Sequence, residues 1–243
     1  MTAALAIIGH RGARGIAPEN TLAGMEAALR LGVDGIEFDI QRHPEGPLFL
    51  LHDLTLDRTT NGHGLAADVS FAALRHLDAG QGEHIPTLDE TLDLVDRRTR
   101  LNIELKTWNG CAEAVAERLK IRLDQGWDAA QFLVSSFHLP ELQRFRAALP
   151  TVPVAALYCG IPLNGAAELH ALGACQAHLS DEFVDADYVH AVRASGRRCW
   201  AYTVNTIDAA QRLASMGIEG IFTDHPERFL RAAVDTTPPP GVL

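Results

Sequence analysis

Short apolar segments, each followed by an amphipathic stretch, recur along the whole of this 243-residue chain. Stretches such as Val115, Leu119 and Leu123 show the spacing of a helix with one buried face. Eight strand–helix units in roughly 250 residues are typical of the α/β class, specifically a (β/α)₈ or TIM barrel. We predict one barrel domain over residues 1–235 and a flexible tail over residues 236–243. The strands are expected to end near His10, Asp39, Lys106, Ser136, Tyr158, Ser180, Thr203 and Thr223.

The second of these segments places apolar and acidic side chains on opposite faces. Its order is Ile36-Glu37-Phe38-Asp39-Ile40, the period-two alternation of a strand. One face is therefore apolar, and the other carries the two carboxylates side by side. Taken alone, the same pattern also fits a half-exposed strand with solvated acids.

Only Gln41 to Pro47 separate this strand from the next apolar run. A parallel crossover needs a dozen residues or more, so we expect a hairpin that turns around Glu45-Gly46. Its register is predicted to place His52 opposite Asp39. An alternative count makes the strand before His52 a barrel stave and leaves the weak segment at Cys175 as a loop.

The regular pattern weakens between Leu54 and Gly82. Thr59 to Gly64 has loop composition, and Ser70 to Leu77 reads as one short helix. We predict that residues 54–82 form a small insertion after the second strand and its hairpin.

The composition of the chain limits the classes of molecule that it is expected to bind. The net charge of −10 argues against nucleic acid or an anionic membrane surface. No apolar run approaches the ~20 residues of a membrane span, and the first residues show neither a basic region nor a cleavage signal. The four cysteines lack C-x-x-C spacing and are expected to be reduced. We expect a cytoplasmic protein without membrane anchoring, and a homo-oligomer is compatible with the sequence.

Charged and polar residues gather where the predicted strands end. Barrel enzymes hold their catalytic residues at these C-terminal strand ends. Glu104 and Lys106 lie in an otherwise apolar strand, and buried charges need partners. The candidates at the ends of the first, second, third, seventh and eighth strands are His10, Arg11, Glu37, Asp39, Glu104, Lys106, Tyr202, Thr203, Asn205, Thr223 and Asp224.

These residues belong to a longer series of motifs that resembles the signature of the glycerophosphodiester phosphodiesterase family. The match runs from His10 to Pro226 in the family's order and spacing. Tyr202 departs from it, because the family usually has tryptophan before Thr-Val-Asn. The motifs are His10-Arg11-Gly12, Pro18-Glu19-Asn20-Thr21, Glu37-x-Asp39, His52-Asp53, Asp57-Arg58-Thr59-Thr60-x-Gly62, Ile85-Pro86-Thr87-Leu88, Asn102-Ile103-Glu104-Leu105-Lys106, Ser136-Phe137, Thr203-Val204-Asn205 and Thr223-Asp224-x-Pro226.

The resemblance implies a metal-dependent hydrolase that splits a glycerophosphodiester into sn-glycerol 3-phosphate and an alcohol. Glu37, Asp39 and Glu104 would then hold one divalent cation. An all-oxygen set suits Mg²⁺ or Ca²⁺ rather than zinc. The resemblance further implies that the substrate and its phosphate are bound by Arg11, Lys106 and Tyr202.

By the same resemblance, His10 and His52 form the proton-transfer pair. The glycerol 2-hydroxyl would attack phosphorus while His10 takes its proton and His52 protonates the departing alcohol. A cyclic phosphate would form, and water would open it. Glu19 and Asn20 are expected to order the first loop, Arg58 to tie down the insertion, and Asn102, Ser136, Asn205 and Asp224 to support the site.

Two other functions remain open. A barrel that binds phosphate and metal without turnover is one, although the intact pair of histidines argues against it. A lysophospholipase D-like enzyme is the other, and it would need an apolar mouth or a membrane-binding helix. The insertion offers only Phe71, Leu74 and Leu77 for such a helix.

Overall fold

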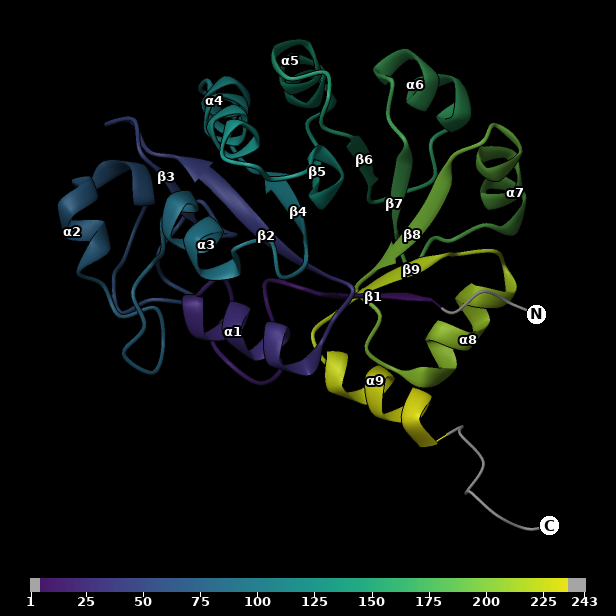
Figure 1. The fold of residues 1–243 in the computed structure, drawn as a ribbon, viewed down its shortest axis with the longest axis horizontal. Helices are drawn as coiled ribbons and strands as arrows, with labels where there is room; N and C mark the ends of the chain where they lie inside the picture. The colour runs from purple at the N-terminus through teal and green to yellow at the C-terminus, as the bar shows by residue number, and fades with distance from the viewer. Residues whose placement is uncertain (1–4, 236–243) are drawn as a thin grey trace.

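The computed structural model describes residues 5–235 and shows a closed barrel of eight parallel strands surrounded by helices (Figure 1). The barrel order is β1-β9-β8-β7-β6-β5-β4-β2, and pairing of β1 with β2 closes it. The predicted (β/α)₈ fold is therefore confirmed. Its strands are β1 (Ala6–Gly9), β2 (Gly35–Arg42), β4 (Arg100–Leu105), β5 (Phe132–Ser136), β6 (Val154–Tyr158), β7 (Gln176–Ser180), β8 (Arg198–Tyr202) and β9 (Gly220–Thr223).

Helices follow the strands in turn and cover the outside of the barrel (Figure 1). Side-chain caps define several of their starts. Thr21 accepts a hydrogen bond from the backbone of Gly24 at the start of the first helix, and Gly32 ends that helix in the left-handed conformation. The helices are α1 (Leu22–Leu31), α2 (Phe71–Arg75), α3 (Leu88–Val95), α4 (Cys111–Asp124), α5 (Leu139–Ala148), α6 (Gly165–Leu172), α7 (Ala186–Ala194), α8 (Ile207–Ser215) and α9 (Pro226–Asp235).

Alternation along the strands separates two apolar regions. On β4, Leu101, Ile103 and Leu105 join the large core between the strands and the helices. The side chains between them turn to the barrel interior, where Asn102 and Glu104 line a cavity. This arrangement explains how charged residues fit within a buried strand: they occupy the face that opens at the barrel mouth.

The hairpin after β2 forms, but its predicted register is wrong by one residue. β3 (Leu48–Leu50) pairs antiparallel with the end of β2, with Ile40 opposite Leu50. The turn has three residues rather than two, because Gly46 adopts a left-handed conformation with φ of 112° and closes the longer loop. The ladder ends at Leu50, so His52 lies in the following loop and not opposite Asp39.

The alternative strand count is also resolved. β3 is an antiparallel addition to the edge of β2, whereas β7, next to Cys175, pairs in parallel with both β6 and β8. The barrel therefore uses the weak seventh segment as a stave.

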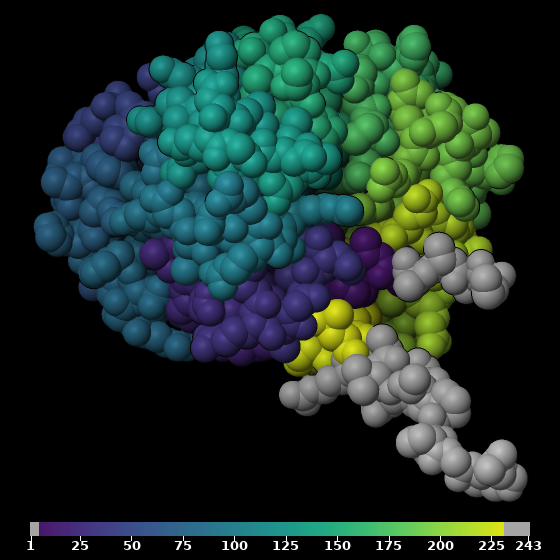
Figure 2. Space-filling model, viewed as in Figure 1, coloured from purple at the N-terminus to yellow at the C-terminus, as the bar shows by residue number. Residues whose placement is uncertain are grey.

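The segment between β3 and α3 forms a lobe with its own small core of Phe49, Leu51, Leu56, Leu74 and Ile85 among others. A 3₁₀ turn (Ala66–Asp68) precedes α2, which is shorter than the helix predicted over Ser70 to Leu77. In Figure 2 this lobe forms the blue flank of the molecule. Across residues 5–235, no helix has the length and apolar character needed to cross a bilayer. The predicted tail, residues 236–243, lies outside the described residues.

Candidate active site

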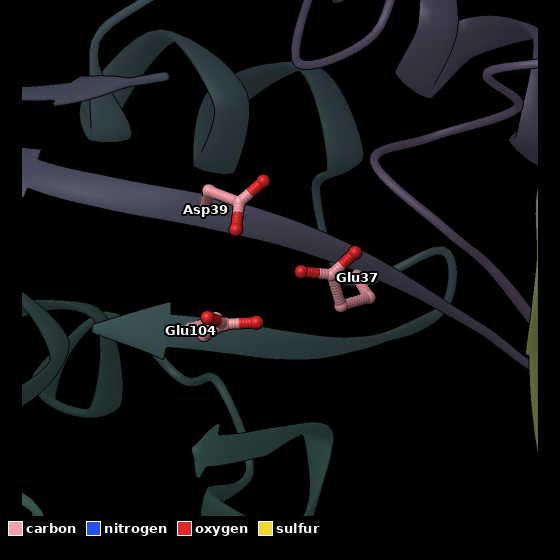
Figure 3. A group of neighbouring side chains, drawn as sticks. All are labelled: Glu37, Asp39 and Glu104. Atoms are coloured by element: carbon pink, nitrogen blue, oxygen red, sulfur yellow. The ribbon is translucent and has the colours of Figure 1, made fainter. Parts of the chain in front are cut away.

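Three carboxylates from two neighbouring strands meet inside the barrel mouth. Glu37 and Asp39 alternate along β2, and Glu104 lies directly across from Asp39 on β4. One oxygen from each carboxylate lies within 4.8 Å of the others (Figure 3). All three residues are buried. The acidic face predicted for the second strand is therefore an interior face, not a solvated one.

Electrostatics make this cluster unfavourable without a cation. Burial, together with the charges of Asp39 and Glu104, raises the pKa of Glu37 well above its ordinary value. Burial and the charge of Asp39 likewise raise the pKa of Glu104. Glu37 Oε1 and Asp39 Oδ1 are buried and accept no hydrogen bond from any described residue. Crowded, unsatisfied oxygens of this kind fit a hard divalent cation.

Two basic side chains border the carboxylates. Lys106 Nζ lies 2.7 Å from Glu104 Oε1 and 3.6 Å from Asp39 Oδ1. The Arg11 guanidinium Nε lies 3.3 Å from Asp39 Oδ2. Arg11 has a φ of 51°, and in this left-handed conformation its backbone N–H donates to Glu37 Oε2 at 2.8 Å. Arg11 and Lys106 thus place positively charged groups beside the carboxylates, where they can also contact an anionic group of a substrate.

His10 directly follows β1 and is oriented by a carboxylate from a residue far along the chain. Its Nδ1 lies 2.7 Å from Asp224 Oδ1, and its Nε2 lies 3.9 Å from Glu37 Oε2. Asn205 fixes Asp224 by donating to its Oδ2 and accepting from its backbone N–H. An Nδ1 proton shared with Asp224 leaves Nε2 free to exchange a proton in the cavity.

His52 is oriented in the same way, by Asp53, whose Oδ1 lies 2.5 Å from His52 Nδ1. Arg58 donates to both oxygens of Asp53 and to both oxygens of Glu19. Glu19 also accepts from Arg11. Burial alone would raise the pKa of Glu19, but the hydrogen bonds from Arg58 and Arg11 lower it to about 2. A continuous chain of ion pairs thus joins the inserted lobe to the first loop.

Asn20 does more than order the first loop, because it also holds one of the three carboxylates in place. Its amide Nδ2 donates to Asp39 Oδ2 at 2.8 Å, and its Oδ1 accepts from the Asp39 backbone N–H. The next residue, Thr21, caps α1. Ser136 donates to the carbonyl of Leu105 and so supports β4.

A cavity of about 170 Å³ connects these groups. Its opposite wall is apolar, with Phe137 and Tyr202 in an edge-to-face pair whose ring centroids lie 5.7 Å apart. The Tyr202 hydroxyl donates to the carbonyl of Tyr158. The lining residues are His10, Arg11, Glu37, His52, Asn102, Glu104, Phe137, Leu157, His178, Tyr202, Thr203 and Phe222.

Several lining residues carried little signal in the sequence. Leu157 is an ordinary apolar strand residue whose inward position only the register reveals. His178 was expected in the core or on the surface, and it lies fully buried in the floor of the cavity. Phe137 stood in a motif but had no assigned role.

An eight-stranded barrel whose C-terminal mouth joins three carboxylates, two basic side chains and two carboxylate-oriented histidines has the makeup of a metal-assisted hydrolase. The family model described as "Glycerophosphoryl diester phosphodiesterase family" matches residues 10–228. The chain belongs to this family.

Individual relatives of this chain support its membership of the family. A glycerophosphodiester phosphodiesterase of Caldanaerobacter subterraneus is 32% identical, over 92% of this chain and 96% of its own. One from Bacillus altitudinis is 33% identical, over 93% and 96%. Among solved structures, an Oleispira antarctica phosphodiesterase in complex with the product sn-glycerol-3-phosphate superposes with a TM-score of 0.87 at 32% identity, covering 95% of this chain and 96% of that one.

Proposed function

We propose that this chain hydrolyses glycerophosphodiesters to sn-glycerol 3-phosphate and an alcohol. The observation that carries the proposal is the convergence of three buried carboxylates within 4.8 Å, two of which, Glu37 and Glu104, line the same cavity as His10 and His52. Family membership and the product bound to the Oleispira antarctica relative support the choice of substrate.

Glu37, Asp39 and Glu104 would hold one divalent cation, Mg²⁺ or Ca²⁺. The fit rests on their oxygen donors, their burial and the two carboxylate oxygens that accept no hydrogen bond from the described residues. When bound, the cation supplies Lewis acidity to the phosphoryl group and to the attacking hydroxyl.

The other side chains of the site would bind the phosphate and transfer protons. Arg11 and Lys106 bind the phosphoryl charge. His10 accepts the proton of the glycerol 2-hydroxyl as its oxygen bonds to phosphorus, and His52 gives a proton to the alcohol oxygen as its bond to phosphorus breaks. Water then opens the cyclic phosphate: His52 takes a proton from the water, and His10 returns one to the 2-oxygen. Both histidines end in their starting states.

A panel of glycerophosphodiesters tests this proposal, with choline, ethanolamine, glycerol and inositol as the alcohols and enzymatic detection of sn-glycerol 3-phosphate. We expect release of sn-glycerol 3-phosphate from at least one of them, and a rate about 10²–10⁴-fold lower after His10→Ala. Release of glycerol with a phosphorylated alcohol, instead of sn-glycerol 3-phosphate, would show that the other ester bond is cleaved and reject the proposal.

A lysophospholipase D-like activity is the second candidate, because the mouth carries exposed apolar side chains. Among the described residues, all the large exposed hydrophobics except Ile121 lie in segments between a strand and the following helix, on the side of the mouth. Release of choline from lysophosphatidylcholine at a rate similar to that from glycerophosphocholine would favour this activity. The exposed apolar side chains on the side of the mouth are Ile16, Leu54, Leu65, Trp108, Phe137, Leu163 and Phe183.

A further inference from the structure

A second cavity lies at the other end of the barrel, among the N-terminal ends of the strands. Its volume is about 370 Å³, larger than the roughly 170 Å³ at the mouth. Catalytic groups of barrel enzymes occupy the C-terminal face, so this cavity has no part in the chemistry described above. Its lining includes Asp34, Arg100, Asn102, Gln176, Arg198 and Trp200.

The charged lining of this lower cavity favours an anion. Arg100 and Arg198 are exposed at the first residues of β4 and β8, and neither makes an ion pair or side-chain hydrogen bond within residues 5–230. Asp34 is the acidic lining residue, and its Oδ2 already accepts from the backbone of Ile7 at 2.8 Å. Two unpaired guanidinium groups therefore face one carboxylate, on a chain whose net charge is −10.

The interior of the lower cavity contains polar atoms without partners. Trp200 is 6% exposed and Asn102 is 5% exposed. Trp200 Nε1 and Asn102 Oδ1 are buried and make no hydrogen bond with any described residue. Because a buried polar atom without a partner is destabilising, a donor and an acceptor left in this state indicate a polar occupant. The surrounding Ile8, Leu133 and Phe132 offer apolar contact.

We propose that the lower cavity is a second ligand site that binds a small amphipathic anion. Its ligand would carry one carboxylate or phosphate group, held by Arg100 and Arg198, on an apolar or aromatic body that packs against Trp200. The chemistry of the lining supports this class: cations at the entrance, then apolar walls, with an indole N–H and an amide oxygen further in.

The roof of the lower cavity is the floor of the catalytic one. Asn102 lines both. Gln176, which lines the lower cavity, lies 3.0 Å from His178, which lines the upper one, and Trp200 stacks on His178 with ring centroids 5.8 Å apart. A ligand that moves Trp200, Gln176 or Asn102 therefore shifts the catalytic floor, so we further expect occupancy to change the rate of hydrolysis.

Calorimetric titration of the full-length protein with 4-phenylbutyrate tests the site, with the neutral 4-phenylbutanol as the matched control. We expect one molecule of phenylbutyrate to bind per chain and the alcohol to bind at least about tenfold more weakly, because the neutral alcohol cannot make hydrogen bonds between two charged groups. Perturbed tryptophan fluorescence should accompany binding.

Two variants locate the bound probe. Arg100→Gln with Arg198→Gln removes the charges, and Ala130→Trp fills the entrance from an exposed position. Both should weaken binding at least about tenfold. Arg118→Gln with Lys120→Gln makes the same change in net charge on the exposed face of α4 and should leave binding unchanged.

Binding that is equal in all these proteins, or absent from the wild type, would overturn the site. So would competitive inhibition of hydrolysis that persists in the Arg100→Gln/Arg198→Gln variant, because the probe would then occupy the catalytic cavity. Binding at the lower cavity with unchanged kcat and KM would retain the site and overturn only the coupling. The calorimetric result does not depend on the proposed hydrolysis.

Discussion

The two sides of the barrel mouth are built on different principles. On the side of β1, β2 and β4, ion pairs or hydrogen bonds hold most of the charged side chains, and two of the residues that form it, Arg11 and Asn20, adopt left-handed backbone conformations. On the side of β5, β6 and β8, Phe137, Leu157 and Tyr202 meet mainly through apolar contact.

We infer from this difference that the charged side carries out the reaction and the apolar side selects the alcohol. Hydrogen bonds have strict distances and angles, so the charged side can place reacting groups to within fractions of an ångström. Apolar contact sets shape but tolerates substitution of similar volume. We therefore expect changes on the charged side to abolish turnover and changes on the apolar side to alter which alcohol is preferred.

Removal of the cation should have the largest effect. Excess chelator should abolish activity, and Mg²⁺ or Ca²⁺ should restore it. Asp39→Asn should lose about 10³-fold or more in kcat/KM, because metal stabilisation of transition-state charge is worth several kcal/mol. Full activity in chelator would remove the functional distinction between the two sides of the mouth.

The same cluster predicts a pH effect on stability that needs no substrate. Without metal, the raised pKa values of Glu37 and Glu104 mean that the folded state holds protons that the unfolded state releases. Stability should therefore fall as pH rises above the ordinary carboxyl pKa of 4.5 and through the raised values. Differential scanning calorimetry should show a Tm that declines over this range, and saturating metal should reverse the decline.

The histidines come next. His10→Ala and His52→Ala should each lose about 10²–10⁴-fold in kcat while metal binding persists. The double variant should lose much less than the product of the two, because both residues act in one proton circuit.

An activated leaving group distinguishes the two histidines. With a nitrophenyl ester as substrate, the nitrophenolate departs without being protonated. His52→Ala should therefore recover most of its rate with this substrate, whereas His10→Ala should not, because the attacking 2-hydroxyl still needs a base. Equal recovery in both variants would show that the roles are wrongly assigned.

Arg58 tests the support of the charged side from outside the cavity. Arg58→Gln breaks the link between Asp53 and Glu19, so His52 loses its orientation. We expect a 10- to 100-fold loss in kcat, about that of other residues that position a catalytic group. Arg118→Gln, on the exposed surface of α4, is the control and should show no loss.

The smallest effect is expected on the apolar side. Phe137→Ala should change kcat/KM by about tenfold for any one substrate but reorder the preference among alcohols. Apolar pockets discriminate by about 1–3 kcal/mol per group, and Phe137, which is 39% exposed, should lie at the low end of that range. A loss as large as that of His10→Ala would mean that the apolar side contributes to the chemistry itself.

Local pattern predicted much of this architecture. The alternation on β2 placed Glu37 and Asp39 on one face, and the barrel rule placed them and Glu104 at the mouth. The resemblance to the family then grouped the three carboxylates as one cation site. The residues expected to form the site do lie together, while their roles stay predictions.

The features that sequence could not supply depend on long-range geometry. The conformation of Gly46 decides the register of the hairpin. The amino-acid sequence of the turn is compatible with both the predicted two-residue turn and the observed three-residue turn. The ion pairs of Arg58 with Glu19 span 39 positions, and the lower cavity depends on how the starts of several strands meet. Periodicity contains no information on either.

The contact between His10 and Asp224 spans 214 positions, from the first strand to the residue after the last. During synthesis on the ribosome, His10 emerges long before the carboxylate that orients it. A nascent or prematurely ended chain thus lacks an oriented His10 however well its first half folds. With the role proposed for His10, full activity therefore requires a closed barrel, and a chain that ends before Asp224 should lack it.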